Sequence, residues 1–218
     1  MMKYGLGYSV ATKIVTWAGR NIAGYRAVEL KEILKHVKEN QKILDFGCND
    51  AYITKLIKDK VPSSDVYGVD INKPAIRYAK KKHKNIKFSV INKGFYKKNR
   101  NKFDFVLLSH VLEHVPDPEE VLGNIKGLLK PKGKLIVAVP QEIFRGEKTF
   151  PQLIYNLIRL RFENPHVRRI SYDSCRKMLE EKEFKVLSFK YTKMFSDSAK
   201  KRKPLLAGSL IVVAELKG

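Results

Sequence analysis

Short apolar runs of strand length alternate with amphipathic segments of helix length over most of this chain. We expect a first strand beginning at Lys42, with further strands at 65–70, 86–91, 103–109 and 134–139. Helices are expected at 25–39, 51–60, 74–83 and 119–130. Strands that alternate with helices predict a parallel sheet covered by helices on both faces.

The end of the chain departs from this alternation. A helix at 172–183 precedes two consecutive strands, at 184–191 and 209–216, joined by a basic loop. Two consecutive strands joined by a loop predict an antiparallel pair.

The segment KILDFGCNDA, from Lys42 to Ala51, combines an apolar run, an acidic residue and a glycine turn. In open α/β sheets a nucleotide-like cofactor lies at the carboxyl end of the first strand, where the chain must turn tightly. The second strand ends in Asp70, whose carboxylate could accept hydrogen bonds from both hydroxyls of a ribose. A strand, turn and helix without a ligand is the simpler alternative for the first loop.

The segment from Phe103 to Pro140, FDFVLLSHVLEHVPDPEEVLGNIKGLLKPKGKLIVAVP, has the order strand, polar loop, helix, turn and strand. With the two acidic strand ends, it resembles the class I S-adenosylmethionine-dependent methyltransferases, in the branch with an SHVLEHVPDP-like segment after the fourth strand. The resemblance covers roughly residues 42–217. It implies an α/β fold with a doubly wound, Rossmann-like, seven-stranded and mostly parallel sheet whose last strand is antiparallel.

The same resemblance implies S-adenosylmethionine as the cofactor and assigns residues to it. The methionine part would lie against the loop of the first strand, and the ribose against Asp70. The adenine would lie against residues that follow the second and third strands. The cofactor-binding residues are therefore expected to be Asp45, Gly47, Asn49, Ala51, Asp70, Ile71, Ile91, Asn92 and Ser109.

Three positions differ from the usual pattern of the family. Asn49 and Ala51 occupy positions where later glycines of the loop are common, and Asn92 replaces an acidic residue. Asparagine tolerates the left-handed backbone that glycine supplies. An asparagine side chain can still donate to, or accept from, an adenine edge.

The polar loop after the fourth strand carries the candidate catalytic residues His110, Glu113 and His114. Methyl transfer to a hydroxyl needs a general base, and a histidine at this edge suits that role, His110 above all. The simpler alternative is that these residues hydrogen-bond the loop and cap the next helix. A metal site completed by His166 is a further alternative, but we expect no metal.

Residues 1–40 are expected to form an arm and a helix that could fold over the cofactor as a lid, ahead of a methyltransferase domain at 41–218. Residues 141–170 do not fit the core pattern and follow the carboxyl end of the fifth strand. We expect this segment to be a substrate-recognition insertion at the cofactor edge.

Charge points to an anionic partner, because 44 basic and 22 acidic residues give a net charge of +22. Basic residues at 200–203 and in the insertion should project from the cofactor edge. RNA, a phosphorylated metabolite or acidic lipid headgroups would suit such an edge. The Asn/Asp-Pro-Pro-aromatic motif of base-amine methylation is absent near Ser109.

These features predict a cytoplasmic methyltransferase without a transmembrane segment, acting on an anionic or surface-bound acceptor, at oxygen. Two alternatives stay open: an RNA methyltransferase, for example at the 2'-oxygen, and a catalytically silent, basic nucleic-acid-binding module. Cys48 and Cys175 are expected to be reduced thiols. The oligomeric state is open.

Overall fold

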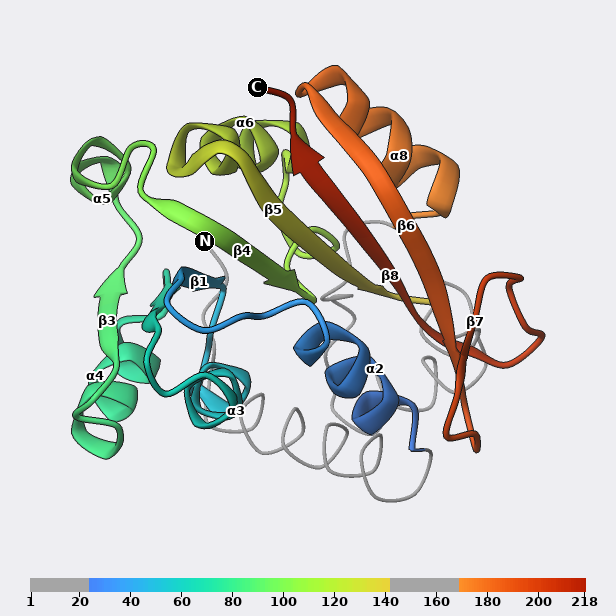
Figure 1. The fold of residues 1–218 in the computed structure, drawn as a ribbon, viewed down its shortest axis with the longest axis horizontal. Coiled ribbons are helices and arrows are strands. Elements are labelled where there is room, and N and C mark those ends of the chain that lie inside the picture. Colours follow the sequence, from blue (N-terminus) through green and yellow to red (C-terminus); the bar gives the residue numbers. More distant parts are fainter. Residues whose placement is uncertain (1–23, 142–168) are drawn as a thin grey trace, which may run out of the picture.

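One eight-stranded sheet organises residues 24–141 and 169–218, the part of the chain that the computed structural model describes (Figure 1). The strand order is β3-β2-β1-β4-β5-β8-β6-β7. The strands are β1 (Lys42–Phe46), β2 (Asp65–Asp70), β3 (Lys87–Val90), β4 (Phe103–Ser109), β5 (Leu129–Pro140), β6 (Phe184–Lys193), β7 (Ala199–Lys200) and β8 (Ala207–Leu216). The predicted arm before residue 24 and the predicted insertion at 142–168 lie outside the described residues.

The sheet confirms the predicted fold class and adds one short strand to it. Strands β1 to β5 pair in parallel, and β8 inserts antiparallel between β5 and β6. The additional strand β7 pairs antiparallel with Tyr191 and Thr192 of β6. Strand β7 has two residues, too few to show an alternation of apolar and polar side chains, so the sequence pattern could not predict it.

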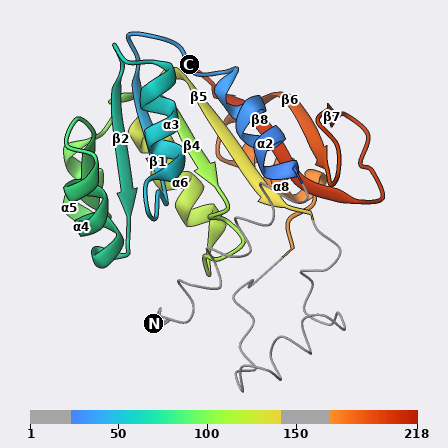
Figure 2. The ribbon, with the colours of Figure 1, turned by 90° about the horizontal axis from the view of Figure 1, so that it is seen from below.

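Helices α2 (Tyr25–Leu34), α3 (Tyr52–Lys60) and α4 (Lys73–Lys82) pack on one face of the sheet, and α5 (Lys93–Lys98), α6 (Pro118–Leu128) and α8 (Tyr172–Glu181) pack on the other (Figure 2). Two hydrophobic clusters separate these helices from the sheet. Ile33, Ile57 and Ile76 belong to the first cluster, and Phe95, Leu122 and Leu179 to the second. The result is the three-layer arrangement of a doubly wound fold.

Side-chain caps explain where several helices begin. Asn72, Asp117 and Ser171 each accept a hydrogen bond from the backbone N–H three residues later, which satisfies a donor that the first helical turn leaves unpaired. These caps place α4, α6 and α8 within one residue of the predicted starts. Asn92 caps α5 in the same way, and this six-residue helix was not predicted.

Helix α2 begins at the predicted residue, ends earlier than predicted and buries acidic as well as apolar residues. Glu29 and Glu32 are buried beside Val28 and Ile33. Glu32 is paired with Lys190 of β6 at 2.8 Å, and Glu29 pairs within the candidate site. The prediction scored only apolar residues and therefore missed a face that buries paired charges.

Among residues 24–141 and 169–218, no helix is both long enough and apolar enough to cross a membrane.

Candidate functional site

The loop after β1 adopts the tight, left-handed conformations that its sequence suggested. Gly47, Asn49 and Ala51 have φ values of 84°, 45° and 65°. The backbone N–H of Gly47 donates to the carbonyl of Val69 at 2.7 Å, which ties the loop to the end of β2. A Cβ atom on Gly47 would lie 2.5 Å from Cγ2 of Val111, so only glycine lets the loop after β4 approach this closely.

Asp70 joins two loops at the same edge of the sheet. Its Oδ2 accepts from the backbone N–H of Asn49 at 2.9 Å, and its Oδ1 accepts from that of Asn72 at 2.7 Å. Each carboxylate oxygen has a second lone pair. The side chain therefore keeps the capacity to accept hydrogen bonds from a diol while it holds both loops.

Asp45 is a buried carboxyl group whose only described side-chain donor is Thr54, at 2.6 Å from Thr54 Oγ1. Burial raises the pKa of Asp45 to about 7, and the charges of Asp70 and Asp50 add to the effect, although the Thr54 hydrogen bond lowers it. These three acids make a region of negative potential in a chain of net charge +22. Such a region favours a cationic ligand.

The residues expected to contact adenine follow β2 and β3. They are Ile71, Ile91 and Asn92. Oδ1 of Asn92 accepts from the backbone N–H of Phe95 at 2.8 Å, and Ile71 is 65% exposed. Ile91 is partly buried against the second cluster. The carbonyl oxygen of Asn92 thus caps α5, which the sequence did not predict.

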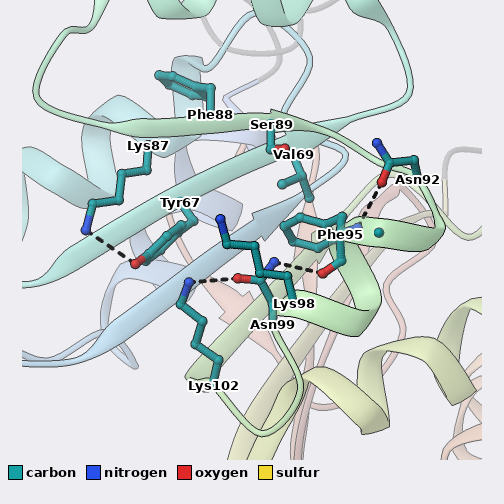
Figure 3. A pocket seen from close by; sticks show the side chains of 11 residues that line it. Tyr67, Val69, Lys87, Phe88, Ser89, Asn92, Phe95, Lys98, Asn99 and Lys102 are labelled. Atoms are coloured by element: carbon teal, nitrogen blue, oxygen red, sulfur yellow. Dashed lines mark hydrogen bonds between the residues drawn. The ribbon is translucent and has the colours of Figure 1, made fainter.

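A cavity of 260 Å³ opens beside Asn92, between α5 and the strands β2 and β3 (Figure 3). Val69 and Ser89 line it near the cofactor edge, and Tyr67 and Lys102 line it near the opposite end of the strands. Nζ of Lys102 lies 4.4 Å from the centre of the Tyr67 ring and donates to Asn99 at 2.7 Å. Lys102 is therefore engaged with the wall of the cavity, as is Lys87, whose Nζ donates to Tyr67 Oη at 3.4 Å.

The loop after β4 is held by a cluster of charged side chains. Nε2 of His110 lies 3.0 Å from Oε2 of Glu29, and Nδ1 of His110 lies 3.2 Å from Oε1 of Glu113. Nε2 of His114 lies 3.8 Å from the same Glu113 oxygen. Ser109 donates to Glu29 at 3.3 Å, and Arg26 forms an ion pair with Glu29 at 3.5 Å. The predicted residues Ser109, His110, Glu113 and His114 therefore gather at one place.

Opposite charges dominate this cluster despite its burial. Burial and Arg26 oppose protonation of His110, but Glu29 and Glu113 together raise its pKa. Burial would raise the pKa of Glu29, yet the charges of His110 and Arg26 lower it to about 2. The pKa of Glu113 is lowered as well, because the His110 contact outweighs burial. His110 is therefore held between two carboxylates that favour its protonated form.

This geometry bears on two predicted roles. With both ring nitrogens facing carboxylates, His110 has no lone pair directed at an acceptor, which weighs against a general base at this position. His114 has a more exposed side chain, 28% against 13% for His110. His166, the fourth residue of the metal alternative, lies outside the described residues. In the described ranges no group of three or more His, Cys, Asp or Glu side chains could hold a metal ion.

Both cysteines are buried in the structure, and burial raises the pKa of each thiol, to about 12 for Cys175. A nucleophilic cysteine needs the thiolate form. Cys48 therefore fills space beside the cofactor loop, where its Sγ would lie 3.0 Å from a Cβ atom on Gly68.

The sequence pattern missed Glu29, Arg26 and Thr54. Each is a polar residue inside a predicted helix, where the expectation is a solvent-exposed side chain. Glu29 could have been singled out only by noting that it shares a helical face with Val28 and Ile33, both of which are buried.

Comparison with known proteins identifies the family of this chain. A family model described as a methyltransferase domain matches residues 20–188. The ubiquinone biosynthesis O-methyltransferase of Coxiella burnetii is 28% identical over 124 residues, which cover 55% of this chain and 52% of that protein. Phosphoethanolamine N-methyltransferase 2 of Caenorhabditis elegans is 26% identical over 107 residues, covering 47% of this chain and 24% of that protein. The chain thus spans about half the length of the first relative.

Among solved structures, a SAM-dependent methyltransferase of Methanosarcina mazei superimposes with a TM-score of 0.66 at 19% identity. The match covers 86% of this chain and 98% of that one. At this identity the likeness concerns the fold, including the order of the strands around the candidate site.

Proposed function

The chain belongs to the class I S-adenosylmethionine-dependent methyltransferase family, and from that membership we propose that it transfers a methyl group to an oxygen atom of an anionic or surface-bound acceptor. The observation that carries the proposal is the acidic edge formed by Asp45, Asp50 and Asp70 in a strongly basic chain. The cofactor of the family is a sulfonium cation, and it supplies the activated methyl group. The negative potential of this edge suits a ligand of that charge.

The geometry of the loops supports the proposed cofactor-binding residues. The left-handed loop at 47–51 would hold the methionine part, and Asp70 would accept hydrogen bonds from the ribose hydroxyls. Ile71, Ile91 and Asn92 flank the adenine, with the amide nitrogen of Asn92 as the donor because its oxygen caps α5. Ser109, fixed by Glu29, closes the site from the end of β4.

Catalysis depends on alignment and on one proton acceptor. Alignment of the acceptor oxygen with the methyl group in a closed site can supply much of the rate enhancement. We assign the general base to His114, with Glu113 beside it to orient the ring and stabilise the imidazolium. His110 serves as the fixed positive centre that holds Glu29 and Glu113 together.

The acceptor class rests on charge and on one relative. Lys200 ends β7, and the basic residues 201–203 lie in the loop that leads from β7 into β8, at the carboxyl edge of the sheet. The oxygen assignment takes support from the O-methyltransferase relative, whereas the N-methyltransferase relative keeps nitrogen as the competing acceptor atom. An RNA methyltransferase is the second candidate, because the same basic loop suits phosphodiesters.

Isothermal titration of S-adenosylmethionine and of its demethylated product tests the proposal. We expect micromolar binding, weakened at least about ten-fold by Asp70→Ala, since a ribose diol would lose both charge-assisted hydrogen bonds. Asp65→Ala is the matched control, because Asp65 lies at the opposite end of the same strand and is exposed. No binding of either compound would refute the enzyme and favour the silent nucleic-acid-binding module.

A further inference from the structure

The hairpin tip, residues 194–206 between β6 and β8, exposes two large apolar side chains at one point. Phe195 is 68% exposed and Leu205 is 85% exposed. The β6–β8 register pairs Lys193 with Ala207, and the backbone N–H of Met194 donates to the carbonyl of Leu206 at 2.9 Å. Phe195 and Leu205 each adjoin this last hydrogen-bonded pair, at the base of the hairpin tip, and we refer to their two exposed side chains as the apolar patch.

Phe195 also has an unfavourable backbone. Its φ is 57°, in the left-handed region that a bulky side chain rarely occupies. Such a conformation is unfavourable for a bulky side chain, and the exposed ring gains nothing from burial in return. Strain and exposure at the same residue indicate that the ring serves a partner outside the domain.

Four consecutive basic residues lie beside this apolar patch. Lys200, Lys201, Arg202 and Lys203 are all exposed, and Asp197 is the one acidic residue of the hairpin tip. Lys203 also lies close to Arg169, whose charge, together with burial, lowers the pKa of Lys203. The hairpin tip therefore combines apolar side chains with a concentrated positive charge.

The hairpin tip projects from the edge of the sheet that carries the candidate site. Pro140, at the carboxyl end of β5, pairs with Ser209, and the backbone N–H of Gln141 donates to the carbonyl of Gly208 at 2.9 Å. The residues just before Ala207 therefore lie at the carboxyl end of β5, and Ala199 and Lys200 of β7 lie alongside Tyr191 and Thr192 of β6. In Figure 1 the loops around β7 extend past the ends of the neighbouring strands.

We propose that the hairpin tip binds the surface of a bilayer that contains anionic lipids. Lysine and arginine side chains are attracted to anionic headgroups, and phenylalanine and leucine enter the boundary between headgroups and acyl chains. A nucleic acid would account for the basic residues and for stacking on Phe195, but it leaves Leu205 without a function. The bilayer accounts for both parts of the hairpin tip.

Flotation with vesicles tests this proposal without S-adenosylmethionine or an acceptor, so that its failure leaves the proposed function untouched. We expect the full chain to bind vesicles of equal parts phosphatidylserine and phosphatidylcholine, and to release them at high salt. The variant F195S/L205S should bind at least about ten-fold more weakly, because two apolar side chains no longer enter the bilayer. The variant K200Q/K201Q/R202Q/K203Q should lose a similar factor on these vesicles.

Two matched controls separate the hairpin tip from general charge and stickiness. K80Q/K81Q/K82Q/K84Q removes the same number of charges from the exposed end of α4, and Y78S/L187S removes two exposed apolar side chains elsewhere. Both should bind vesicles like the parent chain. Equal losses in a control and in the hairpin variant, or full binding by F195S/L205S, would overturn the proposal. So would absence of vesicle binding, including the case in which the hairpin tip binds single-stranded RNA instead.

A tryptophan at the hairpin tip gives a second readout that does not depend on affinity. Brominated acyl chains should quench the fluorescence of Phe195→Trp. The control Leu187→Trp replaces a side chain of β6 that is 43% exposed, and its fluorescence should be quenched no more than that of the unaltered chain. Equal quenching in both variants would show that the hairpin tip does not enter the bilayer.

Discussion

Nε2 of His110 lies 3.0 Å from Oε2 of Glu29, although 81 positions separate the two residues in the chain. The side chains of His110 and Glu29 are 13% and 3% exposed. The contact joins helix α2, which precedes the first strand, to the loop that follows the fourth. Helix α2 is thereby a structural part of the candidate site.

Substitution Glu29→Gln should lower the free energy of unfolding by roughly 3–5 kcal/mol, because it leaves His110 buried with one carboxylate fewer. The pKa of Glu29 is lowered, so its contribution is present above its ordinary pKa and is lost as pH falls toward about 2. The pKa of His110 is raised, so its contribution is complete below its ordinary pKa and is lost at higher pH. Chemical denaturation across pH should show the largest loss between about pH 4.5 and about pH 6.5.

The control for this experiment is Glu181→Gln, which removes an exposed ion pair with Lys177 at 3.9 Å. Exposed pairs contribute about 0–1 kcal/mol, so the control should unfold almost like the parent chain at every pH. A pH-independent loss in Glu29→Gln would contradict a charged His110.

Much of the fold followed from periodicity and caps. The bounds of β2 and β4 agree with the prediction at both ends, since apolar runs of strand length were bounded by polar residues. Strand β7 and the acidic part of the buried face of α2 did not follow. The carboxylates of α2 pair with His110, which follows β4, and with Lys190 of β6, and a hydrophobic period cannot represent such pairing.

The candidate site was predictable at the level of loops but not at the level of contacts. Asp45, Asp70 and His110 could be placed at one edge because parallel strands end there. That Thr54 would bond Asp45 and that Glu29 would bond His110 depends on how helices lean on the sheet. Sequence spacing does not determine that packing.

Substitution Asp45→Asn should stabilise the protein at neutral and alkaline pH. Because burial raises the pKa of Asp45 to about 7, the unfolded chain loses its proton at lower pH than the folded one. Stability therefore falls as pH rises from the ordinary pKa of aspartate to about 7, and then stays constant. The variant should gain roughly 2–4 kcal/mol at about pH 8 and nothing at about pH 4, measured by chemical denaturation. A gain that persists at about pH 4 would contradict this origin.

Substitution Gly47→Ala should lower the free energy of unfolding by about 2–4 kcal/mol, through a strained φ and a clash with Val111. The φ of Gly47 is 84°, and the added Cβ atom would lie 2.5 Å from Cγ2 of Val111. Adding Val111→Ala removes the clash and should restore that part of the lost stability. The loss in free energy of unfolding of the double variant should therefore be about 1 kcal/mol smaller than the sum of the losses of the two single variants. Strict additivity in thermal and chemical unfolding would mean that Val111 moves aside at no cost.

Substitution His114→Gln should lower methyl transfer to a hydroxyl acceptor about 100-fold or more, because the assigned general base is lost. S-adenosylmethionine binding should be unchanged, because His114 lies in the loop after β4 rather than in the loops after β1 and β2. His110→Gln should instead destabilise the fold, since it leaves Glu29 and Glu113 buried without their shared cation. Full activity of His114→Gln at all pH values would show that the acceptor needs no base from this loop.

The affinity for S-adenosylmethionine should rise by roughly three- to ten-fold from about pH 6 to about pH 7.5, because Asp45 gains its charge over that interval and the ligand is a cation. A carboxylate with a pKa of about 7 is half protonated at neutral pH, and a bound cation would favour the ionised form. Titration calorimetry with Asp45→Asn is the control. This variant lacks the charge of Asp45, so any pH dependence that it shows comes from the ligand's own ionisation. If the parent chain and Asp45→Asn show the same pH dependence, the charge of Asp45 does not act on the cofactor, and Asp70 would be the acid to which the sulfonium responds.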